Sequence, residues 1–457
     1  MSKSDETLVN CQNRQGIPHN SSRREFLNTT AMGIGALGLG TLLSSDVEAK
    51  TIGGKGKVER VIHIFLQGGP SHIDTFDPKP KLQQLDGKEL PRGVANGSPF
   101  QFNRSGKSGL EISEVFPELQ KHADDICILR GMTTDVPDHN LATVLMNTGN
   151  FTFSRPSVGS WVTYGLGSSN ENLPAFISLR PGGNPSPQSY QSSFLPGIYQ
   201  GTPINTQLRD VNQMITNIKS YESLGNQRGM LDFLKKQNTI HSLQNNKDFH
   251  LENRIKSFEL AYNMQIEATD AFDVNKEDKK VRDAYGNTPQ GKQMLIARRL
   301  AERGVRFIQA WHGSWDHHSN VKDNISNKSR EIDKPLAQLI ADLKERGVLD
   351  STLIIVGGEF GRTARRDQIS RNNFGRAHQN SVFSTLMIGG GVKGGTAYGS
   401  SDELGIQPVT GKMGVHDLHA TILHALGFDH TKLTYTYNGR PFRLTDVFGN
   451  VHKGIFA

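Results

Sequence analysis

Six short apolar runs that do not alternate with polar positions set the framework of this chain. They are Val61 to Leu66, Ile126 to Leu129, Phe176 to Leu179, Val305 to Ala310, Leu353 to Val356 and Thr385 to Ile388. Continuous apolar runs rich in β-branched residues are typical of strands covered on both faces of a sheet. Amphipathic segments with helical spacing, such as Leu336 to Leu343, lie between them. Strands alternating with helices predict an α/β fold with a doubly wound, mostly parallel sheet.

This alternation breaks between about residues 205 and 275. Leu251, Ile255 and Phe258 keep helical spacing there, while Asn, Gln and Lys dominate around them, which predicts a helical insertion. The composition fits a cap over a functional site and a polar surface appendage equally well. Residues 79–115 and 180–205 are rich in Gly, Pro, Ser and Asn and are predicted as long loops.

The first 49 residues have the features of an export signal. Arg23 and Arg24 precede a glycine-rich hydrophobic run, Ala31 to Gly40, which is too short to span a bilayer stably. Paired arginines before such a run are typical of twin-arginine export, which carries folded proteins. Small residues precede Lys50, so we predict cleavage after Ala49, a mature α/β domain at 50–457 and a periplasmic or otherwise extracytoplasmic location. A chance pair of arginines is the alternative.

Composition narrows the function classes. The 457 residues include 52 basic and 45 acidic ones, a net charge of +7, and loss of residues 1–49 leaves 48 basic and 40 acidic residues, a net charge of +8. This mixed surface favours anionic partners only weakly, and we expect no nucleic-acid partner. Of the two cysteines, Cys11 lies in the predicted signal, so Cys127 cannot form an intrachain disulfide in the mature chain. No later run approaches the roughly 20 apolar residues of a transmembrane helix.

Side chains that bind metals gather next to the predicted strands. Asp74 follows the first strand, Asp316 and His318 follow the strand ending at Ala310, and Glu359 and His378 flank the region between the last two strands. The carboxyl ends of parallel strands face one crevice, where carboxylate and imidazole ligands without thiolates suit a hard or borderline divalent cation. These clusters therefore predict a divalent metal site, with zinc, calcium, magnesium or manganese as the candidate ion, and Asp316 and His318, two positions apart on an extended segment, can point the same way. Helix caps or surface hydrogen bonds are the alternative for each residue.

Two arginines accompany the predicted ligands. Arg362 lies three residues after Glu359, and Arg376 lies two residues before His378. Guanidinium groups beside a metal suit bidentate recognition of a sulfate, phosphate or carboxylate, so we predict that both orient an anionic substrate. A structural ion pair with a neighbouring carboxylate is the alternative.

The same loops carry five longer motifs. They are Gly-Gly-Pro-Ser-His-Ile-Asp-Thr-Phe-Asp-Pro at 68–78, Gly-Glu-Phe-Gly-Arg-Thr at 358–363, Gly-Arg-Ala-His at 375–378, His-Asp-Leu-His-Ala-Thr-Ile-Leu at 416–423 and Asn-Gly-Arg-Pro-Phe-Arg-Leu-Thr-Asp-Val at 438–447. Together they resemble the domain of unknown function family number 1501, from about residue 55 to the C-terminus. Members of that family are described as sulfatase-like, within the alkaline phosphatase superfamily. The resemblance implies a sheet of the alkaline phosphatase or sulfatase-like type, with one or two divalent metals at its strand ends.

The resemblance also gives roles to individual residues. It matches Asp74 to the acidic ligand after the first strand, Asp316 and His318 to the middle ligands, and His378 to the last histidine ligand. Glu359 stands where the superfamily has an aspartate, and a phenylalanine replaces the histidine that normally follows it.

This chain departs from the sulfatases at the nucleophile. Sulfatases carry Cys-x-Pro-Ser-Arg before a Leu-Thr-Gly turn, and the comparable stretch at 138–149 places His139 at the cysteine, so no formylglycine can form. Cys127 lacks the required Pro and Ser around it. His139 is predicted near the reacting atom, as a ligand or a covalent nucleophile, while a metal-bound water or a hydroxyl such as Ser71 or Thr143 stays open as the attacking group. Capping of the following helix is the alternative for His139.

These features predict an exported, metal-dependent, sulfatase-like hydrolase that acts on a sulfate or phosphate ester, with a sulfated polysaccharide as one substrate class. The rival hypothesis is a non-catalytic extracytoplasmic protein that keeps the fold and binds anionic glycans through its positive surface. The missing formylglycine precursor and the phenylalanine after Glu359 favour the rival.

Overall fold

The computed structural model describes residues 57–180, 186–215, 218, 223–244, 249–367 and 374–457. The predicted export signal lies outside these residues. All six predicted strands are present, and together with three further strands they form one nine-stranded sheet. Its members are β1 (Arg60–Leu66), β6 (Ile126–Thr133), β7 (Phe176–Arg180), β8 (Thr202–Asn205), β9 (Phe307–His312), β10 (Thr352–Gly357), β13 (Phe383–Gly389), β14 (Thr396–Tyr398) and β17 (Met413–Gly414).

The strand order is β14-β6-β13-β10-β1-β9-β7-β8, with β17 also paired to β6. Neighbouring strands are parallel except at β13, which runs antiparallel to both β10 and β6. The sheet is therefore mixed and mostly parallel, as predicted. Because β13 runs the opposite way, the residues just before it lie at the same edge as the residues just after β1, β9 and β10.

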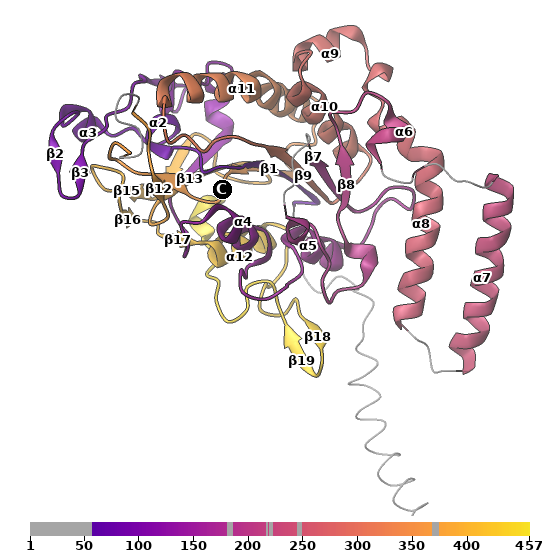
Figure 1. Cartoon of the computed structure of the whole chain (residues 1–457). Helices are drawn as coiled ribbons and strands as arrows, with labels where there is room; N and C mark the ends of the chain where they lie inside the picture. The colour runs from indigo at the N-terminus through magenta and orange to yellow at the C-terminus, as the bar shows by residue number, and fades with distance from the viewer. Residues whose placement is uncertain (1–56, 181–185, 216–217, 219–222, 245–248, 368–373) are drawn as a thin grey trace, which may run out of the picture. The chain divides into compact units, whose positions relative to one another are not determined.

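Helices cover both faces of the sheet (Figure 1). Apolar residues of β1 alternate between the two layers: Ile62 and Ile64 pack in the cluster formed with α10 (Pro289–Glu302) and α11 (Val321–Glu345). Val61 and Phe65 pack in the cluster formed with α4 (His139–Thr148), α5 (Val158–Leu166) and α12 (Val415–Ala425). Burial on both faces explains why the strand sequences are continuous apolar runs.

The range predicted as a helical insertion contains α6 (Val211–Met214), α7 (Leu224–Gln244) and α8 (Phe249–Phe272). Figure 1 shows α7 and α8 side by side beyond the β8 edge of the sheet, away from α4 and from β12 (His378–Gln379). This is the position of a surface appendage rather than of a cap over α4. Among the described residues no helix combines the length and apolarity that crossing a membrane needs.

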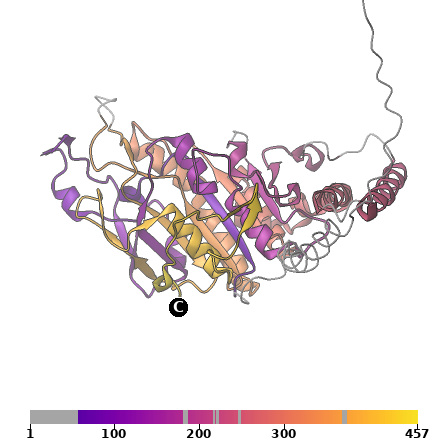
Figure 2. The same ribbon diagram turned by 90° about the horizontal axis from the view of Figure 1, so that it is seen from below.

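Shorter elements complete the described chain, and Figure 2 shows the same ribbon from below. The remaining helices are α2 (His72–Thr75), α3 (Pro80–Gln84), α9 (Lys279–Tyr285), η1 (Leu119–Asp125), η2 (Pro187–Ser189), η3 (Gly197–Tyr199), η4 (Val274–Lys276) and η5 (Lys453–Ile455). The two-stranded pairings are β2 (Glu89–Leu90) with β3 (Gly93–Val94), β4 (Phe102–Ser105) with β5 (Leu110–Ser113), β11 (Gly361–Arg362) with β12, β15 (Ser400–Ser401) with β16 (Pro408–Thr410), and β18 (Tyr435–Tyr437) with β19 (Arg440–Phe442).

Candidate metal centre

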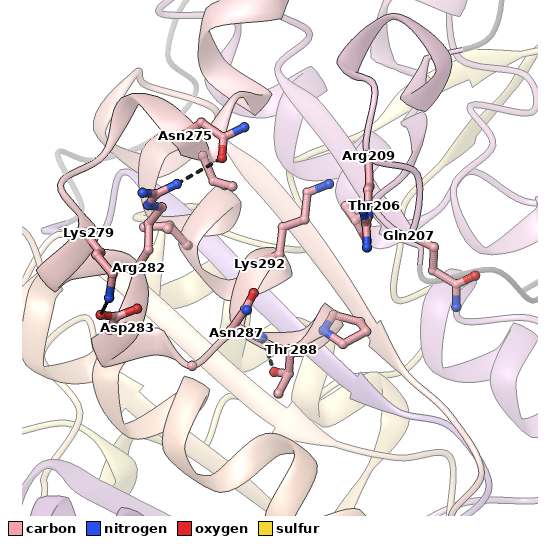
Figure 3. A pocket seen from close by; sticks show the side chains of 15 residues that line it. Thr206, Gln207, Arg209, Asn275, Lys279, Arg282, Asp283, Asn287, Thr288 and Lys292 are labelled. Atoms are coloured by element: carbon pink, nitrogen blue, oxygen red, sulfur yellow. Dashed lines mark hydrogen bonds and ion pairs between the residues drawn. The ribbon is translucent and has the colours of Figure 1, made fainter.

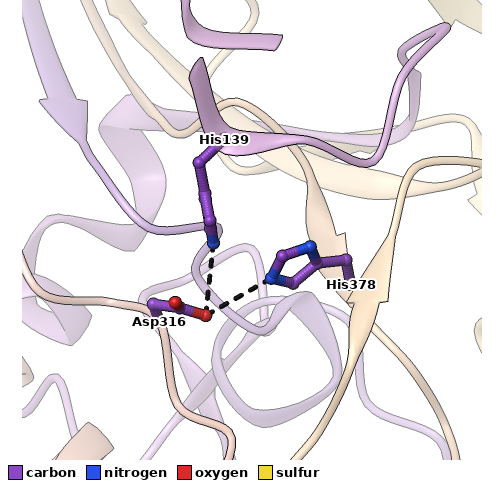
Figure 4. A group of neighbouring side chains, drawn as sticks. All are labelled: His139, Asp316 and His378. Carbon is purple, nitrogen blue, oxygen red and sulfur yellow. Dashed lines mark ion pairs between the residues drawn. The ribbon is translucent and has the colours of Figure 1, made fainter. Parts of the chain in front are cut away.

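Four side chains from three separate segments meet at the carboxyl edge of the sheet. Asp316 and His318 follow β9, His139 is the first residue of α4, and His378 lies in β12, shortly before β13. Figure 4 shows three of them, with His139 and His378 both directed at the carboxylate of Asp316. Within the described part of the chain, His139, Asp316 and His378 form the group whose ligand atoms lie within 4.8 Å of one another.

Three imidazole Nε2 atoms surround one carboxylate oxygen, Asp316 Oδ1. Their distances from it are 2.9 Å for His318, 3.2 Å for His139 and 3.4 Å for His378. The Nε2 atoms of His318 and His378 are 3.1 Å apart. Ligand atoms held about 2.0–2.1 Å from a tetrahedral ion are about 3.3–3.4 Å from each other, and the distances to Asp316 Oδ1 are close to this spacing. His318 nevertheless lies outside the group of three whose ligand atoms are all within 4.8 Å of one another.

The opposite nitrogen of each imidazole faces an acceptor. Nδ1 of His139 lies 2.5 Å from Glu359 Oε1, and Nδ1 of His318 lies 2.5 Å from Asp367 Oδ2. Nδ1 of His378 donates to the carbonyl oxygen of Pro137 at 2.7 Å. A neutral histidine whose Nδ1–H donates has its lone pair on Nε2. Three lone pairs and a carboxylate oxygen therefore face one another, an arrangement that suits a cation.

The local charge and hydrogen bonding fit such a cation. With the histidines neutral, the carboxylates of Asp316, Glu359 and Asp367 and the guanidinium of Arg362 leave two net negative charges, the complement of a divalent ion. Nε2 of His139 is buried without a hydrogen-bond partner among the described residues, because its contact with Asp316 lacks hydrogen-bond geometry. Hydrogen bonds from Nδ1 to carboxylates or carbonyls are typical of metal-bound histidines.

Without an ion, protons are drawn to the same place. Burial lowers the pKa of His139, but the contacts with Asp316 and Glu359 outweigh it and raise the pKa to about 9. Burial raises the pKa of the Asp316 carboxyl, but its contacts with the two histidines and with Arg362 prevail and hold that pKa far below its usual range. Both shifts show that the cluster stabilises positive charge at the imidazole of His139.

Glu359, predicted as a ligand, lies behind His139 rather than among the converging atoms. Its side chain is fully buried, and its Oε1 also accepts a hydrogen bond from the backbone N–H of Gly68 at 2.9 Å. Gly68 adopts φ +113°, and a Cβ there would lie 2.6 Å from the backbone nitrogen of Asp316. Only glycine fits this close approach, which sets the loop that carries Asp316 against the end of β1.

The residue after Glu359 forms part of the wall of the cluster. The buried ring of Phe360 lies 4.7 Å from the ring of His139 and 4.7 Å from that of His378, measured between centroids. Phenylalanine at this position supplies no ligand, but it packs against two of the converging imidazoles and restricts their orientation.

Arg362 holds the cluster from inside the protein. Its buried guanidinium donates to Asp316 Oδ1 at 2.5 Å, to the carbonyl of Gly69 at 2.9 Å and to that of Arg376 at 3.1 Å, and it also contacts the carbonyl of Gly68. It lies 3.5 Å from His318 Nε2. The N–H groups of Arg362 are thus engaged by the protein, which favours a role in positioning Asp316 over the predicted contact with a substrate anion.

Asp74 and Arg376 pair with each other instead of joining the histidines. The fully buried Arg376 donates to Asp74 through Nε at 2.7 Å and through Nη2 at 2.9 Å. Its remaining N–H groups donate to the backbone carbonyls of Asn96, Gly97 and Thr363. All five guanidinium N–H groups are used in this way, and Asp74 also accepts from Ser71 Oγ at 2.5 Å. The structure therefore favours the ion-pair interpretation of Arg376, and it gives Asp74 a partner other than a metal.

The other residues weighed from the sequence have clear positions. Asp138, not His139, caps α4, because its side chain accepts from the backbone N–H of Leu141 at 2.9 Å. Thr143 is buried in α4, and the thiol of Cys127 is buried in β6, where burial raises its pKa. Asp367 was missed, because no spacing rule links it to His318, which is 49 positions away.

Several solved structures are similar to this chain. No curated protein sequence matches the chain. Among solved structures it is similar to the PsFucS1 sulfatase from Pseudoalteromonas sp., with 13% identity, TM-score 0.36, and 84% of this chain and 70% of that chain covered. The C-terminal periplasmic domain of EcEptC from Escherichia coli, in complex with Zn, is 10% identical with TM-score 0.36, and the match covers 86% of this chain and 94% of that chain. A mutant TAB5 alkaline phosphatase with Mg bound is 10% identical with TM-score 0.32, and the match covers 77% of this chain and 96% of that chain.

Similarities of this size carry no activity from those proteins to this chain. A family model described as "Protein of unknown function (DUF1501)" matches residues 58–456, nearly the whole described chain. The protein therefore belongs to the DUF1501 family.

Proposed function

We propose that this protein is an exported, metal-dependent hydrolase of sulfate or phosphate esters. The observation that carries the proposal is the convergence of three histidine Nε2 atoms on Asp316 Oδ1, each imidazole held by an acceptor at its other nitrogen. The motifs at 68–78, 358–363 and 375–378, which resemble those of a family described as sulfatase-like, support the same reaction class. The predicted export signal supports a location outside the cytoplasm.

In this proposal His139, His318, His378 and Asp316 hold the ion. A donor set of three nitrogens and one carboxylate favours zinc over calcium or magnesium, which prefer oxygen ligands. When bound, such an ion acts as a Lewis acid toward an ester and lowers the pKa of a coordinated water. The buried carboxylate of Glu359 fixes the ring of His139, and Asp367 does the same for His318.

The cluster is open to solvent on one side, as a reaction site requires. The exposed side-chain fractions are 42% for Asp316, 31% for His318 and 25% for both His139 and His378. Asp316 Oδ2 makes no hydrogen bond or ion pair recorded within the described chain, whereas Oδ1 faces the imidazoles and Arg362. Solvent therefore reaches the Asp316 carboxylate on this side of the cluster, while Nε2 of His139 stays buried.

Metal content and turnover test the proposal together. The protein, exported by its native route, is expected to retain about one zinc per chain and to hydrolyse at least one member of a panel of aryl sulfates, phosphates and phosphonates. Asp316→Asn should lose both properties, while Asp323→Asn, an exposed carboxylate on α11, should keep them.

Two outcomes would contradict the hydrolase. One is a chain that retains no divalent metal in elemental analysis. The other is a metal-loaded protein that turns over nothing but binds sulfated polysaccharide in a strongly salt-dependent way, which would establish the non-catalytic glycan-binding protein instead.

A further inference from the structure

A second concave site lies at the β8 edge of the sheet, outside the metal cluster. It is a cavity of about 810 Å³ formed by the segment after β8, by η4 and α9, and by the first turn of α10. Figure 3 shows its side chains, with Lys292 in the middle, Arg209 on one side of it and Arg282 on the other. Neither the family motifs nor the metal cluster include these residues.

Cations dominate the lining of this cavity. Arg209, Lys279, Arg282 and Lys292 line it against the single carboxylate of Asp283, and that carboxylate is paired with Lys279 at 2.5 Å. The remaining three cations have no carboxylate among the residues that line the cavity. Three positive charges therefore face one concave surface.

The three cations keep donors available. Arg209 is exposed and has no hydrogen bond or ion pair with the rest of the described chain. Arg282 donates to Asn275 through Nη1 at 2.9 Å, while its buried Nε has no partner among the described residues. Lys292 uses one proton for the carbonyl of Leu208 at 2.7 Å. Burial lowers the pKa of Lys292, Asp273 opposes this and Arg209 adds to it, so an anion placed here would relieve an unfavourable charge environment.

The first turn of α10 adds a fixed dipole to the same wall. Thr288 caps the helix by accepting from the backbone N–H of Gly291 at 3.0 Å, and Pro289 occupies the first turn. A Cβ on Gly291 would lie 2.1 Å from the carbonyl oxygen of Gly286, so glycine is required for the loop from α9 to pack on the helix. The positive end of this 14-residue helix is thereby held rigidly at the cavity.

The cavity and the metal cluster share one edge of the sheet. Thr206 and Gln207 follow the carboxyl end of β8 directly, as Asp316 follows β9. Gln293, next to Lys292, donates to the carbonyls of Leu179 in β7 and Trp311 in β9 at 2.9 and 3.2 Å, which ties the cavity wall to these strand ends. Since β7 alone separates β8 from β9, the two strand ends are about 10 Å apart.

We propose that this cavity is an anion-binding site for a sulfate or phosphate group of an extended, multiply charged oligosaccharide. Arg209, Arg282 and Lys292 bind the oxyanion, and the N-terminal end of α10 contributes the positive end of its helix dipole. The same ligand is long enough to place another ester group at the metal cluster, and this last part rests on the function proposed above.

Calorimetric titration of the full, metal-loaded protein with a size-fractionated dextran sulfate oligosaccharide tests the site. Arg209→Gln combined with Lys292→Met removes two cations from the cavity and keeps most of the unbranched stem of both side chains. Arg104→Gln combined with Lys107→Met removes the same charge from an exposed hairpin elsewhere. The cavity variant should bind the oligosaccharide roughly tenfold more weakly or worse, because charge-assisted hydrogen bonds are lost, while the hairpin variant should stay within about twofold of wild type.

Competition identifies the group that is bound. Inorganic sulfate and inorganic phosphate, added separately, should displace the oligosaccharide from wild type but have little effect on the residual binding of the cavity variant, and the stronger competitor shows which ester the site prefers. Equal weakening in the cavity and hairpin variants, or no weakening in either, would overturn the proposal. Repeating the titration in the Asp316→Asn background separates the two ideas, because the cavity effect should persist there even if no ester is hydrolysed.

Discussion

Replacement of Glu359 by Gln distinguishes a ligand from a residue that positions a ligand. The sequence predicts Glu359 as a metal ligand, whereas its carboxylate lies 2.5 Å from Nδ1 of His139, on the side away from the converging Nε2 atoms. Glutamine keeps the size and can place its oxygen at the Oε1 position, where it still accepts from His139 and Gly68, but it removes the negative charge behind the imidazole and sets its NH2 group against the N–H of Gly68 at the Oε2 position. The bond that weakens is buried and charge-assisted.

The magnitude follows from that geometry. A hydrogen bond to a charged group contributes about 1.5–3 kcal/mol, and loss of the partner behind a metal-bound histidine typically costs 10–100-fold in metal affinity. We therefore expect Glu359→Gln to bind zinc roughly 10–100-fold more weakly while still reaching one ion per chain at saturation. His378→Ala, which removes a converging nitrogen, should leave no metal after dialysis.

Competition against a chromophoric chelator at fixed pH measures the affinity, and elemental analysis measures the stoichiometry. Glu345→Gln, an exposed carboxylate at the end of α11, serves as the control and should match wild type. Wild-type affinity in Glu359→Gln would refute the positioning role. A loss as complete as that of His378→Ala would restore Glu359 as a ligand, as the sequence predicts.

Three further predictions follow from the structure. Chelation of the ion should lower the thermal midpoint of unfolding. If the free metal concentration is a hundred times its Kd before chelation, the folded protein loses about 2.7 kcal/mol of stabilisation. An unchanged midpoint would argue against a bound ion. Gly68→Ala should displace the Asp316 loop, because the added Cβ meets a backbone atom at 2.6 Å. Calorimetry should show a loss of stability of roughly 1–3 kcal/mol, and elemental analysis should show a lower metal content. Burial lowers the pKa of His63 to about 4, so between pH 6.5 and 4 the unfolded chain takes up a proton that the folded protein excludes. Stability should therefore fall with acidification by up to about 1.4 kcal/mol per pH unit from this group, and His63→Leu should show a shallower slope in denaturant titrations; equal slopes would contradict this.

The prediction for His63 can be tested separately from the predictions for the metal, because His63 and the metal cluster lie in different parts of the molecule. His63 lies between the rings of Phe65 and Phe307 in the apolar layer, not in the metal cluster. Loss of metal at low pH would instead reflect protonation of the converging imidazoles, so the slope should be measured on metal-free protein.

The pattern of apolar residues along the chain predicts most of the central sheet. The apolar runs predict β1, β6, β7, β9, β10 and β13 because a strand covered on both faces needs no polar alternation. The segments next to these strands predict where Asp316, His318 and His378 gather, because the carboxyl ends of parallel strands share one edge. His139 emerged from its place in a motif, although its cap-like position at the start of α4 also allowed a structural explanation.

Only the tertiary structure decides which of these side chains converge. Asp74 and Glu359 have the same ligand chemistry as Asp316, yet Asp74 pairs with Arg376 across 302 positions of sequence, and Glu359 lies behind His139 across 220. Asp367 carried no signal at all. Secondary structure follows from neighbours in the chain, but the direction in which a carboxylate points depends on groups brought close by folding. The sequence alone therefore predicts the edge of the sheet at which the candidate ligands lie, and the packing of the folded chain determines which of their atoms face one another.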